Sequence, residues 1–64
     1  MWAVVYIASG KKQIGTIIDL LQKEGILYRL HYLGLPAEET VNAEILVSKS
    51  EVEEAIDLIH RYAF

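Results

Sequence analysis

Two side chains of this 64-residue sequence, His31 and Glu44, could act together in acid–base chemistry. Each lies in a stretch with the alternating pattern of a β-strand, and an imidazole beside a carboxylate is a common arrangement for proton transfer. The sequence has no cysteine nucleophile and no serine at a spacing typical of a serine–histidine site. Because a pair on an open sheet stays accessible to water, we interpret His31 and Glu44 as a structural cross-strand pair and predict no catalytic residue.

A second candidate is the segment Ser9-Gly10-Lys11-Lys12, which opens a predicted helix. Free backbone amides at a helix start can hold a phosphate or a carboxylate. A P-loop, however, needs a longer glycine loop that ends in Lys-Ser or Lys-Thr, and Gln13 follows here. Solvated lysines beside a helix cap are the favoured interpretation, and a small anion at this helix start is the alternative.

Composition excludes several classes of function. The net charge of −3 and six scattered basic residues argue against nucleic-acid binding, which needs a basic patch. His31 and His60 are far apart and no cysteine is present, so we predict no metal site, and the small size leaves no room for a cofactor. No apolar run approaches the roughly 20 residues that cross a bilayer, and no signal peptide is recognisable. We therefore expect a cytoplasmic protein without a membrane partner.

The elements that must position these side chains follow the order β-α-β-β-α within a single domain, residues 1–64. We predict strands at 1–8, 26–33 and 41–47, a loop at 34–40, and helices from Ser9 to about Glu24 and from Ser50 onward. Chain-crossover rules place the third strand between the first two, antiparallel to both, with both helices on one face. This is an α+β, ferredoxin-like fold that lacks its fourth strand, with a three-stranded antiparallel sheet of order 1-3-2.

Each predicted helix has an apolar stripe. The first is formed by Ile14, Ile17, Ile18 and Leu21, with Gly25 just past its end and Gly15 inside it, where a close approach and simple tolerance are equally good explanations. Ser50 and Glu53 have the spacing of a capping box at the start of the second helix. Its predicted buried face comprises Val52, Ala55, Ile56, Ile59 and Tyr62.

The hairpin register predicts which side chains share the open face of the sheet. Residue numbers that sum to 75 pair Leu30 with Ile45 in the core and His31 with Glu44 on the open face. That face should display Trp2, Val4, Tyr6, Arg29, His31, Glu44 and Leu46. We interpret Trp2, Tyr6, Arg29, His31 and Glu44 as a partner-binding surface for a protein, with a platform for a small ligand as the alternative.

The first strand is the predicted oligomer seam. A chain this short buries only about 60% of its unfolded surface, and 53% hydrophobic residues is a high fraction for its size, so we expect a homo-oligomer. In the order 1-3-2 the outer edge of this strand has no partner, because the chain ends where a fourth strand would begin. The edge, with Trp2, Val4, Val5 and Tyr6, lacks the lysine, proline or bulge that usually blunts such edges. A two-fold edge-to-edge dimer is the favoured arrangement and a sheet-face dimer the runner-up.

Nearly the whole chain also resembles a known family. The similarity lies in the segments WAVVYIA (2–8), LLQKEGI (20–26), EILV (44–47) and EVEEA (51–55). The chain is similar to a family of small bacterial proteins that are described as prokaryotic signal-transducing domains, with a fold like that of the nitrogen-regulatory PII proteins. The resemblance implies a PII-like, ferredoxin-like fold and a role in signal transduction. In the trimeric PII proteins a long nucleotide-sensing loop joins the second and third strands, where this chain has only residues 34–40.

Overall fold

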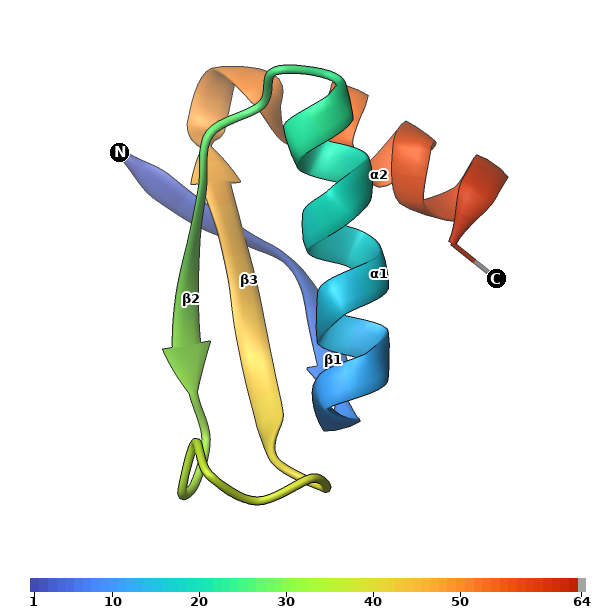
Figure 1. Cartoon of the computed structure of the whole chain (residues 1–64). Helices are drawn as coiled ribbons and strands as arrows, with labels where there is room; N and C mark the ends of the chain where they lie inside the picture. The colour runs from blue at the N-terminus through green and yellow to red at the C-terminus, as the bar shows by residue number, and fades with distance from the viewer. Residues whose placement is uncertain (64) are drawn as a thin grey trace.

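The computed structural model describes residues 1–63. Its elements are β1 (Trp2–Ser9), α1 (Gly10–Lys23), β2 (Tyr28–Tyr32), β3 (Asn42–Ser48), the short 3₁₀ helix η1 (Lys49–Glu51) and α2 (Val52–Tyr62). The predicted β-α-β-β-α order is confirmed, with boundaries shifted by one or two residues. Figure 1 shows the three strands in one sheet with both helices on the same side of it.

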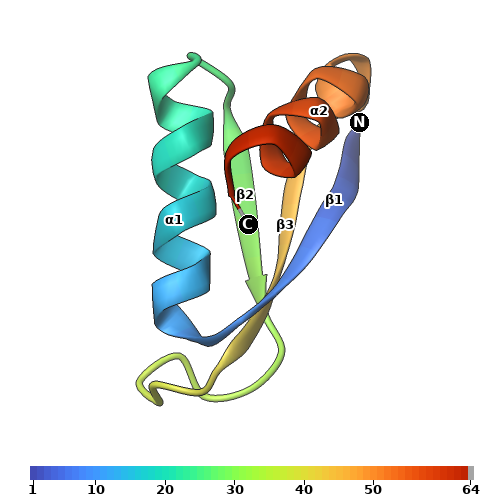
Figure 2. The same cartoon turned by 90° about the vertical axis from the view of Figure 1, so that its right-hand side faces the viewer.

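The sheet has the order β1-β3-β2, and both pairs of strands are antiparallel. Leu30 lies opposite Ile45 and His31 opposite Glu44, so the predicted hairpin register is confirmed. In Figure 2, turned by 90°, α2 lies in front of the strands and α1 lies to one side of them. The fold is α+β, a three-stranded antiparallel sheet covered by two helices.

The core lies between the helices and one face of the sheet. Alternate residues of β3 point into it, and Ala43, Ile45 and Val47 are fully buried. The other fully or almost fully buried apolar side chains are Ala8, Ile14, Ile17, Leu21, Ile26, Val41, Ala55 and Ile59. The predicted stripe of α1 is thus confirmed, with Ile18 partly buried beside it. Within residues 1–63, no helix is long and apolar enough to cross a membrane.

A glycine-based cap ends α1. Gly25 has a φ of 73°, its N–H donates to the Gln22 carbonyl (3.1 Å), and the Ile26 N–H donates to the Leu21 carbonyl (2.9 Å). These are the two hydrogen bonds of a Schellman motif, in which the residue after the glycine packs on the last turn. Ile26 and Leu21 are both buried. Because Ile26 is used in this way, β2 begins at Tyr28 rather than at the predicted position 26.

A β-bulge interrupts β1 and corrects two predictions. Val4 lies opposite Leu46 and Tyr6 opposite Ile45, so Val5 is an extra residue without a register partner on β3. The first strand therefore does contain one of the features that blunt an edge. The inserted residue also reverses the alternation, because a shift of one position exchanges the two faces of a strand. Tyr6 consequently lies on the helix-covered face and packs against the core.

The start of α2 differs from the predicted capping box. The chain first makes the turn η1, and the cap position of α2 is Glu51, without a side-chain hydrogen bond. The Ser50 hydroxyl lies 3.1 Å from that of Ser48 instead. Beginning the helix at Val52 sets which residues face the sheet: Ala55 and Ile59 are buried, whereas Ile56 (37%) and Tyr62 (63%) are exposed. The prediction that Ile56 and Tyr62 belong to the buried face is therefore wrong.

Candidate functional site

The face of the sheet that carries no helix, called the open face below, is made of three rows of side chains. In one row Val4, Leu46 and Arg29 lie side by side across the strands. In the next row Ile7, Glu44 and His31 lie side by side, and Trp2 extends the β1 end of the face opposite Ser48. The apolar, aromatic and charged side chains of the open face are therefore Trp2, Val4, Ile7, Arg29, His31, Glu44 and Leu46, with Ser9, Asn42 and Ser48 as its further polar residues.

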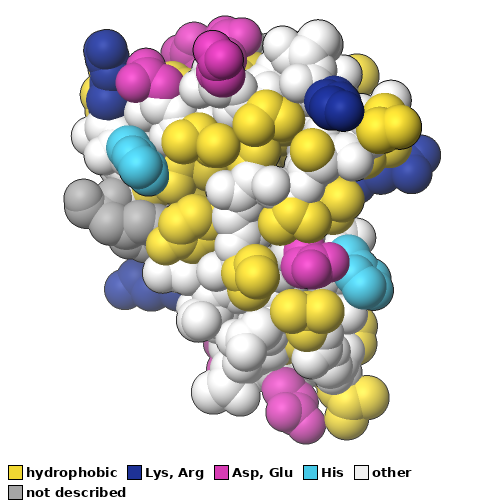
Figure 3. Space-filling view, turned by 180° about the vertical axis from the view of Figure 1, so that it is seen from behind, with side chains coloured by type: hydrophobic (Ala, Val, Ile, Leu, Met, Phe, Trp, Pro, Cys, Tyr) yellow, Lys and Arg dark blue, Asp and Glu magenta, His cyan; other side chains and the backbone are white. Residues whose placement is uncertain are grey.

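Apolar side chains form a column along β1 at one margin of this face. Trp2 is 37% exposed, Val4 45% and Ile7 55%. Figure 3, the view from behind, shows hydrophobic side chains gathered across the middle of the molecule, with a histidine and an acidic side chain adjoining at one margin. Exposed apolar groups that gather in this way mark protein contacts more often than isolated ones do.

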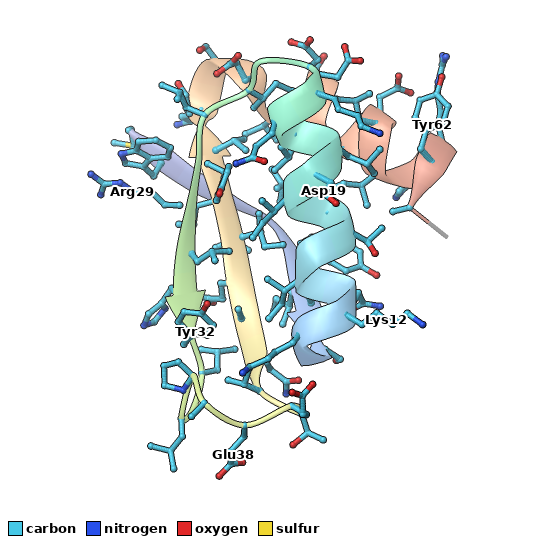
Figure 4. The ribbon with its side chains drawn as sticks, in the orientation of Figure 1. Lys12, Asp19, Arg29, Tyr32, Glu38 and Tyr62 are labelled. Carbon is cyan, nitrogen blue, oxygen red and sulfur yellow. The ribbon has the colours of Figure 1, made fainter. Side chains whose placement is uncertain are left out.

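Arg29 reaches across the middle strand to Trp2. Its guanidinium carbon lies 4.6 Å from the centroid of the Trp2 ring. Figure 4 shows the Arg29 side chain beside the aromatic ring at the start of β1. An arginine over the face of an indole is attracted by the negative charge of that face, and the contact fixes both side chains on the open face.

His31 and Glu44 form the predicted cross-strand pair. The His31 Nδ1 atom lies 2.8 Å from Glu44 Oε1, and both side chains are accessible to water. Nearby positions on the open face hold Ile7, Arg29 and, one row further along β1, Ser9 opposite Asn42. Within residues 1–63, the Ser9 hydroxyl makes no hydrogen bond to His31 or Glu44. The arrangement fixes the position of the imidazole and neutralises Glu44 whenever His31 is protonated.

Of the five predicted partner-binding residues, the structure brings four onto the open face: Trp2, Arg29, His31 and Glu44. Tyr6 is on the other face, and Ile7 occupies the place predicted for it. Sequence reasoning missed Ile7 because β1 is uncharged throughout and apolar on both faces. Such a strand gives no alternation from which a shift of face can be read. Of the predicted seam residues, Trp2 and Val4 are exposed, whereas Val5 and Tyr6 are half-buried against the core.

The start of α1, the alternative anion site, is covered by the loop between β2 and β3. The Gly10 N–H donates to the Val41 carbonyl (2.8 Å) and the Lys11 N–H to the Glu39 carbonyl (3.0 Å). The Lys11 ammonium group donates to the Ala37 carbonyl (3.2 Å), and the Ser9 N–H to Gln13 Oε1 (2.6 Å). The Ser9 hydroxyl makes no cap bond. Both Figure 1 and Figure 2 show this loop beside the first turn of α1. The first two amides of α1 are thus already bonded to loop carbonyls.

Within residues 1–63, no pocket is present, and no three histidine, cysteine, aspartate or glutamate side chains gather closely enough to hold a metal ion. In comparisons with known proteins, the chain matched no protein-family model, no curated protein and no solved structure. The open face and the outer edge of β1 are therefore the candidate functional surfaces.

Proposed function

We propose that this protein is a small, non-enzymatic interaction or regulatory module with a ferredoxin-like fold, which works as a homo-oligomer through β1. The observation that carries the proposal is the outer edge of β1. No strand pairs with this edge among residues 1–63, none of its residues is charged, and exposed Trp2, Val4 and Ile7 lie beside it. Pairing with a second copy would bond backbone groups along this edge and bring these side chains of the two copies side by side on one continuous open face.

The other edge of the sheet supports the choice of β1. The outer strand β2 carries Arg29 and His31, both exposed. Charged side chains on an edge strand discourage pairing, because two copies would bring like charges together and desolvate them. The two edges of this sheet thus differ in charge, and the uncharged one is the candidate seam. The bulge at Val5 shortens the regular stretch of β1 that could form backbone hydrogen bonds with a second copy. Side-chain contacts must therefore also contribute to the stability of the seam.

The regulatory part of the proposal rests on the resemblance to the small prokaryotic signal-transducing domains. The α+β topology and the sheet order 1-3-2 are compatible with the PII-like arrangement that the resemblance implies. A small-ligand sensor is the alternative, and it is supported less well because loop carbonyls already accept the first amides of α1. Contact with a protein requires only an exposed surface, which the open face provides.

The test is the substitution Ile7→Lys, with molecular mass read by light scattering. The side chain is exposed on β1, so the charge should be tolerated in a monomer but repelled across a two-fold seam. We expect the wild-type protein to show at least twice the 7.3 kDa of one chain and the variant to show a single chain. Leu35→Lys is the matched control, because Leu35 is an exposed apolar residue in the loop between β2 and β3, outside β1.

A wild-type mass of one chain at high concentration would overturn the seam. So would an Ile7→Lys variant that is folded and keeps the wild-type mass. Hydrogen exchange separates the two arrangements of a dimer. In an edge-to-edge dimer the outward amides of β1 exchange more slowly as concentration rises, whereas a face-to-face dimer leaves them unpaired and fast.

A further inference from the structure

The open face carries the charged side chain of Arg29, which is not one of the residues of the proposed seam. Among residues 1–63, the His31 imidazole lies 2.8 Å from the Glu44 carboxylate and the Arg61 guanidinium 3.1 Å from that of Asp57, whereas Arg29, like the four lysines, is in no ion pair. Arg29 meets no carboxylate in this part of the chain and rests on the ring of Trp2. A guanidinium beside an indole face has its N–H donors along its own edges, where they can still bind a carboxylate. Arg29 is therefore a positioned donor group for an acid.

The apolar column lies next to this donor. Trp2, Val4 and Ile7 follow one another along β1, and Arg29 is separated from them by Leu46 alone in the row of Val4. The column from Trp2 to Ile7 faces the four residue steps from Ser48 to Glu44 on β3, because the bulge at Val5 adds a residue without adding length. At about 3.3 Å per residue it spans roughly 13 Å, which matches about two and a half turns of an α-helix. The opposite face of the same sheet is already covered by helices, and helix on sheet is the usual way to bury a face of this kind.

We propose that the open face binds an amphipathic helix of a partner protein, whose apolar stripe lies on Trp2, Val4 and Ile7 and whose flanking carboxylate binds Arg29. The occupant is specified by charge complementarity: its apolar stripe matches the β1 column, and its acid supplies the carboxylate that Arg29 lacks among residues 1–63. This inference deepens the proposed function by naming the chemistry of the partner.

The test uses two synthetic helical peptides of about 18 residues, a length at which an isolated helix becomes stable. Both carry leucines at helical spacing; one has glutamates and the other lysines beside the leucine stripe. Trp2 is the only tryptophan of the chain, so its fluorescence reports binding directly. We expect the glutamate peptide to bind at least about tenfold more tightly than the lysine peptide, because a charge-assisted hydrogen bond to arginine is gained only with the acid.

Two variants of Arg29 make the assignment specific. Arg29→Gln should remove most of the preference for the glutamate peptide, and Arg29→Glu should reverse it in favour of the lysine peptide. Lys12→Gln, which removes an equal charge from α1, should leave the preference unchanged; Figure 4 shows Lys12 on the side of α1 away from the sheet. Both positions are exposed, so the three variants are expected to fold, which circular dichroism checks.

Equal binding of both peptides, binding of neither, or a preference that survives Arg29→Gln would each overturn the inference. The inference would also be overturned if Arg29→Gln lowered the mass of the protein measured without peptide, because a second copy would then occupy this face. Failure of this inference can be told apart from failure of the proposed function, because peptide binding tests the first and molecular mass tests the second. Arg29 lies on β2, at the edge opposite β1, and meets the proposed seam at the Trp2 ring, so light scattering on the same samples reports separately whether the oligomer is kept.

Discussion

The guanidinium of Arg29 lies 4.6 Å from the ring centroid of Trp2, and this contact joins the two edge strands over the middle one. Contacts of this kind at exposed sites contribute about 0.5–1 kcal/mol. A double-mutant cycle with Arg29→Gln and Trp2→Leu is therefore expected to give a coupling free energy in that range. Urea unfolding of the four proteins measures it, and a coupling indistinguishable from zero would show that the stacking does not persist in solution.

The Ser50 hydroxyl bonds the Ser48 hydroxyl instead of capping α2. A serine that caps a helix loses about 1 kcal/mol on replacement by alanine, whereas an exposed hydroxyl pair is worth less. We expect Ser50→Ala to lower the free energy of unfolding by less than about 0.5 kcal/mol. A loss of 1 kcal/mol or more in denaturant unfolding would indicate that the capping box forms in solution after all.

Gly15 lies inside α1, and a methyl group added there would meet no atom of residues 1–63 within 4 Å outside its own helix. The explanation by close approach is therefore wrong, and the glycine is merely tolerated. Replacing it by alanine should stabilise the protein by about 1 kcal/mol, through helix propensity and the reduced entropy of the unfolded chain. Gly25→Ala is the matched contrast: its φ of 73° strains an alanine, so thermal unfolding should shift downward.

His31 and Glu44 form an exposed pair on the open face. Exposed ion pairs and cross-strand pairs contribute at most about 1 kcal/mol. His31→Gln should accordingly leave the oligomeric state unchanged and shift the free energy of unfolding by about 0.5 kcal/mol or less. Mass and unfolding measured on the same variant check this. Loss of binding to a metabolite that copurifies with the wild-type protein would instead assign His31 to a ligand site.

Much of the fold could be predicted because local patterns were strong and agreed with one another. The stripe of α1 has helical spacing, Gly25 lies one residue after its cap, and the alternation of β3 admits only one buried face. Once that face was known, the hairpin register followed, since slipping by one residue would bury Arg29 and His31 and expose Leu30.

The sequence by itself thus determined the elements, the sheet order and the pairing of His31 with Glu44. Three features were decided by tertiary structure alone: the bulge at Val5, the turn before α2, and the closure of the 33–41 loop on the start of α1. Each depends on how an element fits against a neighbour distant in the chain, and an uncharged strand or a serine-rich turn carries no local signal of that fit. The bulge matters most, because one inserted residue turns Tyr6 into the core and brings Ile7 to the open face.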